Sequence, residues 1–307
     1  MEIKKVLRLL GPLIVEGVLS VRNLSHERLI EMLHELPFMT RSINTRNNSV
    51  VIELQNLDVD MLYRLLAGEA NKFLLASRVS HQRSTQNQYN NASWQAVENY
   101  YAAYYGVHYL LRLTGVSVTS LDAQNIECIV QSYYARTLNF SIPSGLYVMQ
   151  YDDATKVLTL TNIKKSGGSH QSIWQQWETL IEKLCSQTNS DPREYAAISI
   201  DLTEHKQFLK KSTAKYNPPE IRGEINYQFK GGAWVFEKNS EKSIGFLQRS
   251  IAGADLQVPL KASTPASLIA NNKIIISLAK AVFVDASEKY PKSICRALFN
   301  KYKSYVS

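Results

Sequence analysis

Apolar residues recur every three or four positions between Ala92 and Gly115, which is the spacing of one face of an α-helix. A second apolar line that begins at Trp94 lies beside the first, so the predicted helix is apolar around most of its circumference. A helix of this kind is buried in a larger core. Ala102 and Gly106 lie one turn apart on it, and their small size would let another backbone approach closely. Gly115 follows as the left-handed residue at which many helices end.

The hydrophobic pattern also predicts β-structure and two further helices. Residues 49–54 are rich in β-branched side chains, and residues 144–163 alternate between apolar and polar around Asp152, which is typical of a β-hairpin. Residues 172–186 have the pattern of an amphipathic helix, and residues 265–289 that of a strongly apolar one. The chain therefore combines many helices with a smaller amount of β-structure.

Residues that can cap a helix predict where several helices begin. Thr264 precedes a proline at the first position of the apolar helix, which is a favoured arrangement. Thr203 is expected to cap a helix over residues 204–216. A further helix over residues 121–138 is expected to start near Asp122.

These elements predict a mainly α fold of the α+β class. A helical bundle is expected to occupy residues 59–140 and 190–307. Residues 141–189 would form an insertion of a β-hairpin and a helix, and residues 1–58 a small N-terminal α/β portion. At 307 residues the chain is long enough to bury a sizeable core and to hold one or two domains.

Charge and composition narrow the classes of function. A net charge of +8 is compatible with nucleic acid or another anionic partner, and equally with a soluble protein that has many lysines. The three cysteines are far apart, which argues against a disulfide framework and favours a reducing cytosol. The histidines show no metal-ligand spacing, and there is no glycine loop of the P-loop or dinucleotide type. We therefore expect neither a metal nor a cofactor.

The apolar stretches of the chain are short. None approaches the ~18 apolar residues of a membrane span, and the longest candidate, residues 274–284, contains Lys280. The apolar run at the N-terminus is interrupted by Arg8, Pro12 and Glu16, which favours a structural helix over an export signal. We expect a cytoplasmic protein that does not enter a membrane.

The central helix carries a tyrosine–alanine pattern, YYAAYY at residues 100–105 followed by HYLL at residues 108–111. This pattern resembles the long helix of the HEPN superfamily, and the resemblance covers little more than this helix. It implies an up-and-down helical bundle at the centre of the fold, with the hairpin as an insertion. It also implies a component of a prokaryotic defence or toxin-type system that binds nucleic acid or a partner protein and forms a homodimer.

Catalytic members of this superfamily are metal-independent ribonucleases that carry an arginine followed, after four to six residues, by a histidine. Arg222 stands in the place of that arginine, and the resemblance implies that it holds the phosphate. Tyr227 stands where the histidine is expected, and a tyrosine with its ordinary pKa of about 10 is a poor base at neutral pH. This departure favours a non-catalytic relative or altered chemistry. In the structural alternative, Arg222 is a surface charge and Asn226 and Tyr227 hold a turn.

His108 is the other candidate for acid–base chemistry. It lies on the central helix one turn before Arg112, from where it would face Arg222 across the bundle. In the alternative interpretation it is a core histidine that bonds to a tyrosine hydroxyl, and the apolar surroundings favour this alternative.

Basic residues are concentrated near Arg222, and such cations attract the phosphates of single-stranded nucleic acid. The alternative is an ordinary solvated helix face. The candidate nucleic-acid-binding residues are Lys206, Lys210, Lys211, Lys215 and Lys230.

Three functions from different classes follow from these observations. The first is a HEPN-like component that binds RNA, other single-stranded nucleic acid or a partner protein without cleaving it. The second is a metal-independent ribonuclease, and its candidate catalytic residues are Arg222, Asn226, Tyr227 and His108. The third is a structural subunit whose apolar helices are buried against another chain. The sequence favours the first and leaves open whether the protein is an enzyme.

Overall fold

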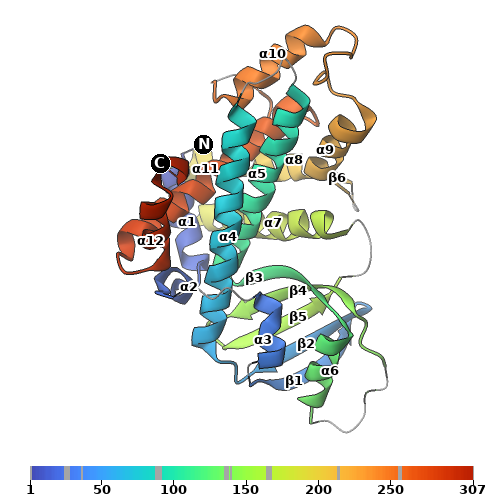
Figure 1. The fold of residues 1–307 in the computed structure, drawn as a ribbon, viewed down its shortest axis with the longest axis vertical. Helices are drawn as coiled ribbons and strands as arrows, with labels where there is room; N and C mark the ends of the chain where they lie inside the picture. Colours follow the sequence, from blue (N-terminus) through green and yellow to red (C-terminus); the bar gives the residue numbers. More distant parts are fainter. Residues whose placement is uncertain are drawn as a thin grey trace.

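The computed structural model describes residues 2–23, 28–35, 37–86, 92–134, 138, 140–163, 168–212, 215–254 and 258–306. Over these residues the protein is mainly helical with a five-stranded antiparallel sheet, so it belongs to the mixed α+β class. Figure 1 shows the sheet at the lower end of the molecule, with helices α4 (Val59–Thr85) and α5 (Ala92–Leu113) extending away from it. Buried apolar side chains from both parts form one connected core.

The sheet joins strands from separate stretches of the chain in the order β1-β2-β5-β4-β3. The strands are β1 (Met39–Arg46), β2 (Ser49–Gln55), β3 (Val116–Leu121), β4 (Gly145–Asp152) and β5 (Val157–Asn162). The predicted hairpin is confirmed as β4 and β5, and the predicted strand at 49–54 as β2. Because β2 pairs with β5, the predicted N-terminal portion and the predicted insertion contribute to one sheet rather than to two units.

The pair of α4 and α5 forms the centre of the helical part, and α11 (Pro265–Lys289) packs against α5. The predicted buried helix is confirmed, since most residues of α5 are buried. A Cβ added at Gly106 would lie 3.2 Å from Cγ2 of Ile275 on α11. The Ser77 hydroxyl of α4 donates to the carbonyl of Ala102 over 2.6 Å. Both small residues therefore lie in contact with a neighbouring helix.

Capping side chains fix where two of the predicted helices begin. Thr264 accepts a hydrogen bond from the backbone N–H of Ser267 over 3.1 Å, which confirms the predicted start of α11. Asp122 likewise caps α6 (Ala123–Gln131) through the N–H of Asn125. That helix is shorter than predicted, because it ends at Gln131 and Tyr133 pairs with Thr40 of β1 instead.

The predicted helix start at Thr203 is wrong. Helix α8 (Pro192–Leu209) runs through this position without a break, and Asp191 caps it. The Thr203 hydroxyl donates to the carbonyl of Ser199 over 2.7 Å, four residues earlier in the same helix. A threonine can make this bond inside a helix as readily as it caps one, so its presence alone does not mark a helix start.

Helix α11 is long and apolar enough to span a membrane by length and composition, which differs from the expectation that no stretch approaches this limit. In the protein, 67% of its most apolar window is buried. Its packing against α5 accounts for this burial, as in the core helix of a folded domain.

The remaining elements lie around this centre and beside the sheet, and Figure 1 shows α7 and α9 beside α5. The helices are α1 (Ile3–Leu10), α2 (Glu16–Ser20), α3 (Met32–Glu35), α7 (Gly168–Gln187), α9 (Asn217–Gln228), α10 (Ser240–Ile251), α12 (Ile294–Lys301) and α13 (Lys303–Val306). The 3₁₀ turns are η1 (Gly11–Leu13), η2 (Leu29–Glu31) and η3 (Thr188–Ser190), and the short strands β6 (Lys210–Ser212) and β7 (Lys215–Tyr216) form a separate two-stranded sheet.

Candidate anion-binding site

Helix α9 positions Arg222 beside the tyrosines of α5. The buried residues Ile221 and Ile225 anchor α9 against α5 and α7. The guanidinium carbon of Arg222 lies 5.6 Å from the ring centroid of Tyr100 and 5.5 Å from that of Tyr227, which is within cation–π range. Nη1 of Arg222 also donates to the Tyr227 hydroxyl over 3.3 Å. The structure therefore brings together two of the predicted site residues.

Arg222 has no carboxylate partner among the described residues. Its side chain is half-buried, and its Nε atom is fully covered without a hydrogen-bond partner there. A buried cation is costly unless it is paired, so this guanidinium is poised to bind an anion.

Most of the predicted lysines, unlike Arg222, have a carboxylate partner. Four of them lie within ion-pair distance of a glutamate: Lys206 with Glu182 at 2.8 Å, Lys210 with Glu178 at 3.5 Å, Lys211 with Glu224 at 3.1 Å and Lys215 with Glu220 at 3.4 Å. Lys230 is exposed and has no such partner in the described part of the chain. Surface pairs of this kind are weak and exchange readily, so binding through these lysines stays a prediction, but the free guanidinium of Arg222 is the stronger candidate.

His170, in the first turn of α7, completes the site. Its Nδ1 lies 2.8 Å from the hydroxyl oxygen of Tyr100, and its ring stacks on Tyr104 with 4.3 Å between centroids. Burial and the nearby charge of Arg222 lower the pKa of His170, so its imidazole is neutral at pH 7.

The hydrogen bonds around Tyr100 favour one tautomer of His170. Nε1 of Trp174 donates to the Tyr100 oxygen over 3.2 Å, so the tyrosine's own proton is free to point toward His170. This buried hydroxyl is satisfied when it donates to Nδ1 of the histidine. The proton of the neutral imidazole then resides on Nε2, which has no partner among the described residues. His170 thus offers an N–H donor beside a guanidinium.

His108 lies in the core beside Arg112 and does not face Arg222. It is buried, stacks on Phe73 with 4.3 Å between centroids, and its Nδ1 lies 2.9 Å from Nη1 of Arg112. Burial, followed by the charge of Arg112, lowers the pKa of His108 well below its usual value. The arginine in turn binds Glu69 over 2.6 Å. His108 therefore belongs to a buried ionic network, and its partner is an arginine rather than the tyrosine hydroxyl of the alternative interpretation.

The other predicted catalytic residues lie at the outer end of α9. Asn226 follows Arg222 by one turn and is half-buried, whereas Tyr227 is 69% exposed. Sequence reasoning missed His170, because no spacing along the chain connects it with Arg222. Its place at the start of an amphipathic helix after a glycine-rich connector was the only local feature that set it apart.

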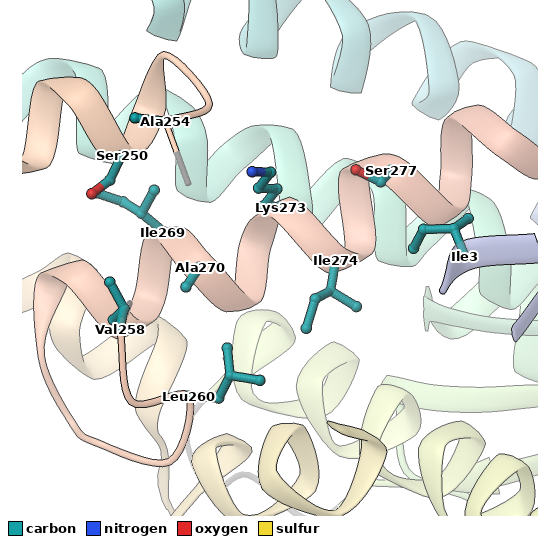
Figure 2. Close-up of a pocket in the computed structure, with 10 residues that line it drawn as sticks. All are labelled: Ile3, Ser250, Ala254, Val258, Leu260, Ile269, Ala270, Lys273, Ile274 and Ser277. Atoms are coloured by element: carbon teal, nitrogen blue, oxygen red, sulfur yellow. The ribbon is translucent and has the colours of Figure 1, made fainter. Parts of the chain in front are cut away.

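A separate pocket of about 250 Å³ lies along α11, and Figure 2 shows the residues that line it. Its lining is largely aliphatic, and the Lys273 ammonium donates to the carbonyl of Gly253 over 3.3 Å. None of the predicted site residues lines this pocket. Within the described residues there is also no group of three or more His, Cys, Asp or Glu side chains that could hold a metal ion.

No family model, no curated protein and no solved structure matches this chain.

Proposed function

We propose that this protein is a HEPN-like, RNA-binding protein that holds a backbone phosphate of a single strand between Arg222 and His170 without cleaving it. The observation that carries the proposal is the half-buried guanidinium of Arg222, which has no carboxylate partner in the described residues and lies beside a neutral imidazole.

The chemistry of these two groups suits a phosphate. A guanidinium presents several N–H donors in a plane and binds phosphate oxygens in a bidentate manner. The Nε2–H of His170 adds a donor that carries no charge of its own. The ring of Tyr100, which contacts both residues, supports them from inside the core. The phosphate would thus replace water around Arg222 and compensate its charge.

The tautomer of His170 favours binding over cleavage. A general base needs a free lone pair, but the lone pair of Nδ1 faces the Tyr100 hydroxyl and Nε2 carries the proton. In this proposal the protein retains the arginine of the catalytic superfamily members, but no group beside this arginine can act as a general base.

The biological system in which this function would operate is inferred only from the resemblance to the HEPN superfamily. The antiparallel pair of α4 and α5, covered by α7, α9 and α11, is the part of the fold that would correspond to a HEPN-like bundle. We place the protein in a prokaryotic defence or toxin-type system on that basis, with a protein partner or a second copy of the chain as further expectations.

The test measures binding and cleavage of labelled single-stranded RNA and DNA in the presence of EDTA. We expect salt-sensitive binding of RNA without cleavage. Arg222→Ala should raise the dissociation constant about 10- to 100-fold, as expected for loss of a charged hydrogen bond. It should also reduce the magnitude of the log–log salt slope by about 0.7.

Arg46→Ala is the matched control, because Arg46 is an exposed arginine on β1 without an ion pair in the described residues. It removes the same charge far from the site. Equal weakening by the two substitutions would mean that only net charge attracts the RNA. Cleavage that persists in EDTA and disappears in Arg222→Ala would replace the proposal with a ribonuclease.

A further inference from the structure

Four aromatic side chains form an exposed cluster at the outer end of α9. Trp94 is 55% exposed, Phe229 51% and Phe236 64%, and Trp234 joins them as a partly buried member. Trp234 stacks on Phe236 with 5.3 Å between centroids, and it contacts Phe229 at 5.4 Å and Trp94 at 6.2 Å. We call this group the aromatic platform. Large exposed aromatic groups in contact with one another are unusual on a surface without a ligand.

The loop that carries the platform is built to hold it in place. The carboxylate of Glu237 accepts hydrogen bonds from the backbone N–H groups of Gly232, Ala233 and Trp234, each at 2.8 or 2.9 Å. The indole N–H of Trp234 donates to the carbonyl of Ile225 on α9 over 2.7 Å. The rings are therefore ordered before any ligand arrives, which reduces the entropy lost on binding.

The platform adjoins the phosphate site. The two share helices α5 and α9: Arg222 lies over Tyr100, six residues after Trp94 on α5. Trp234 is bonded to the carbonyl of Ile225, which lies one turn after Arg222 on α9. A base and its own phosphate are also adjacent along a nucleic-acid strand. A strand held at Arg222 would therefore place neighbouring bases over the exposed rings.

Charges around the platform favour an anionic ligand over a neutral one. Lys230, Lys238 and Lys242 are exposed and have no carboxylate partner among the described residues. The carboxylate of Glu237 is occupied by backbone N–H groups, which leaves Glu241 as the exposed acid of this segment. Cations interleaved with aromatic rings are the combination that binds single strands without sequence preference.

We propose that the aromatic platform stacks the bases of the single strand whose phosphate lies at Arg222. This inference rests on the proposed function and specifies its ligand further, because it requires unpaired bases rather than phosphates alone. Stacking on an aromatic ring contributes about 1–3 kcal/mol per base, which corresponds to an affinity ratio of roughly 5- to 150-fold.

The experiment compares two labelled probes of equal length and charge, an oligouridylate and an abasic oligoribonucleotide, by fluorescence anisotropy. Phe236→Ala should weaken binding of the oligouridylate by roughly fivefold or more and leave binding of the abasic probe unchanged. Phe236→Tyr, which retains a ring, should restore the affinity. Tyr134→Ala removes a ring that is 86% exposed in another part of the protein and should affect neither probe.

The two proposals fail in different ways. If Phe236→Ala weakens both probes equally or neither, the platform does not stack bases, although loss of binding in Arg222→Ala would still support the phosphate site. If the unaltered protein binds neither probe nor single-stranded RNA, both proposals are overturned. Phe236 is largely exposed, so its replacement is not expected to prevent folding, and a circular dichroism melt verifies this.

Discussion

The Tyr100 hydroxyl oxygen lies 2.8 Å from Nδ1 of His170, and this hydrogen bond connects the buried face of α5 with the surface at Arg222. It leaves Nε2 of the histidine as the donor available to a ligand. We expect His170→Ala to weaken RNA binding about tenfold, and His170→Gln to weaken it less, because glutamine retains an N–H donor. The measurement is anisotropy with labelled RNA. An equal effect of His34→Ala, which alters an exposed histidine on α3, would contradict a specific role for His170.

The same hydroxyl has a role in stability. In Tyr100→Phe, the buried Nε1 of Trp174 would lose its acceptor, so we expect the free energy of unfolding to fall by about 1–3 kcal/mol in urea denaturation. Tyr109→Phe is the matched control, since the Tyr109 hydroxyl is buried on the same helix without a hydrogen-bond partner among the described residues. Its removal should be neutral or stabilising. Equal destabilisation by both substitutions would show that the hydrogen bond is not the cause.

Glu69 and Arg112 form an ion pair that is largely shielded from solvent, with 2.6 Å between Oε2 and Nε. Glu69→Ala would leave the Arg112 charge uncompensated in the core and remove the acceptor of the Leu29 N–H. We expect a loss of about 3–5 kcal/mol in the free energy of unfolding. Glu182→Ala breaks the exposed pair with Lys206 and should cost about 1 kcal/mol or less. Similar losses in denaturant titrations of the two variants would contradict this prediction.

Burial lowers the pKa of His205 to about 4. Its Nε2 accepts from the indole N–H of Trp177 over 2.8 Å, so the neutral ring carries its proton on Nδ1, which donates to Asn271. The unfolded chain takes up a proton below about pH 6.5, whereas the folded protein does not until about pH 4. The contribution of His205 to stability is therefore complete above pH 6.5 and falls by about 1.4 kcal/mol per pH unit over this interval.

In His205→Gln, we expect the free energy of unfolding to change less steeply with pH between pH 6.5 and pH 4. The difference in slope should correspond to about one proton fewer taken up on unfolding. The measurement is the free energy of unfolding as a function of pH for the variant and the unaltered protein. A variant with the same slope would show that His205 is not responsible for it.

The three cysteines differ in accessibility and environment. Burial raises the pKa of Cys295 to about 11 and also raises the pKa of Cys185. Cys128 is half-buried on α6, and its sulfur lies 3.4 Å from Nδ1 of His34. We expect iodoacetamide to modify Cys128 first at neutral pH, because the thiolate is the reacting form and burial disfavours it at the other two sites. Peptide mass spectrometry after a short reaction measures the order, and earlier modification of Cys185 or Cys295 would contradict it.

The sequence by itself determined those elements that depend only on interactions between nearby residues. The apolar circumference of α5, the small residues Ala102 and Gly106, the cap at Thr264 and the hairpin around Asp152 were all predictable. In each case the pattern has one favourable solution, because burial of the apolar face or satisfaction of the first N–H groups decides it locally. The capping rule failed at Thr203. The Thr203 hydroxyl donates to the carbonyl of Ser199 in the preceding turn, so the helix continues through this position without a break.

Tertiary structure decided what depends on residues far apart in the chain. The pairing of β2 with β5 unites strands separated by about a hundred positions, and no local pattern specifies that partner. Likewise, Arg222 was identifiable from the sequence, but its lack of a carboxylate partner and its closeness to His170 depend on how α9 and α7 pack against α5. Local patterns fix hydrogen bonds and faces within one element. Which faces meet, and therefore which charges are left for a ligand, is set by the packing of the whole core.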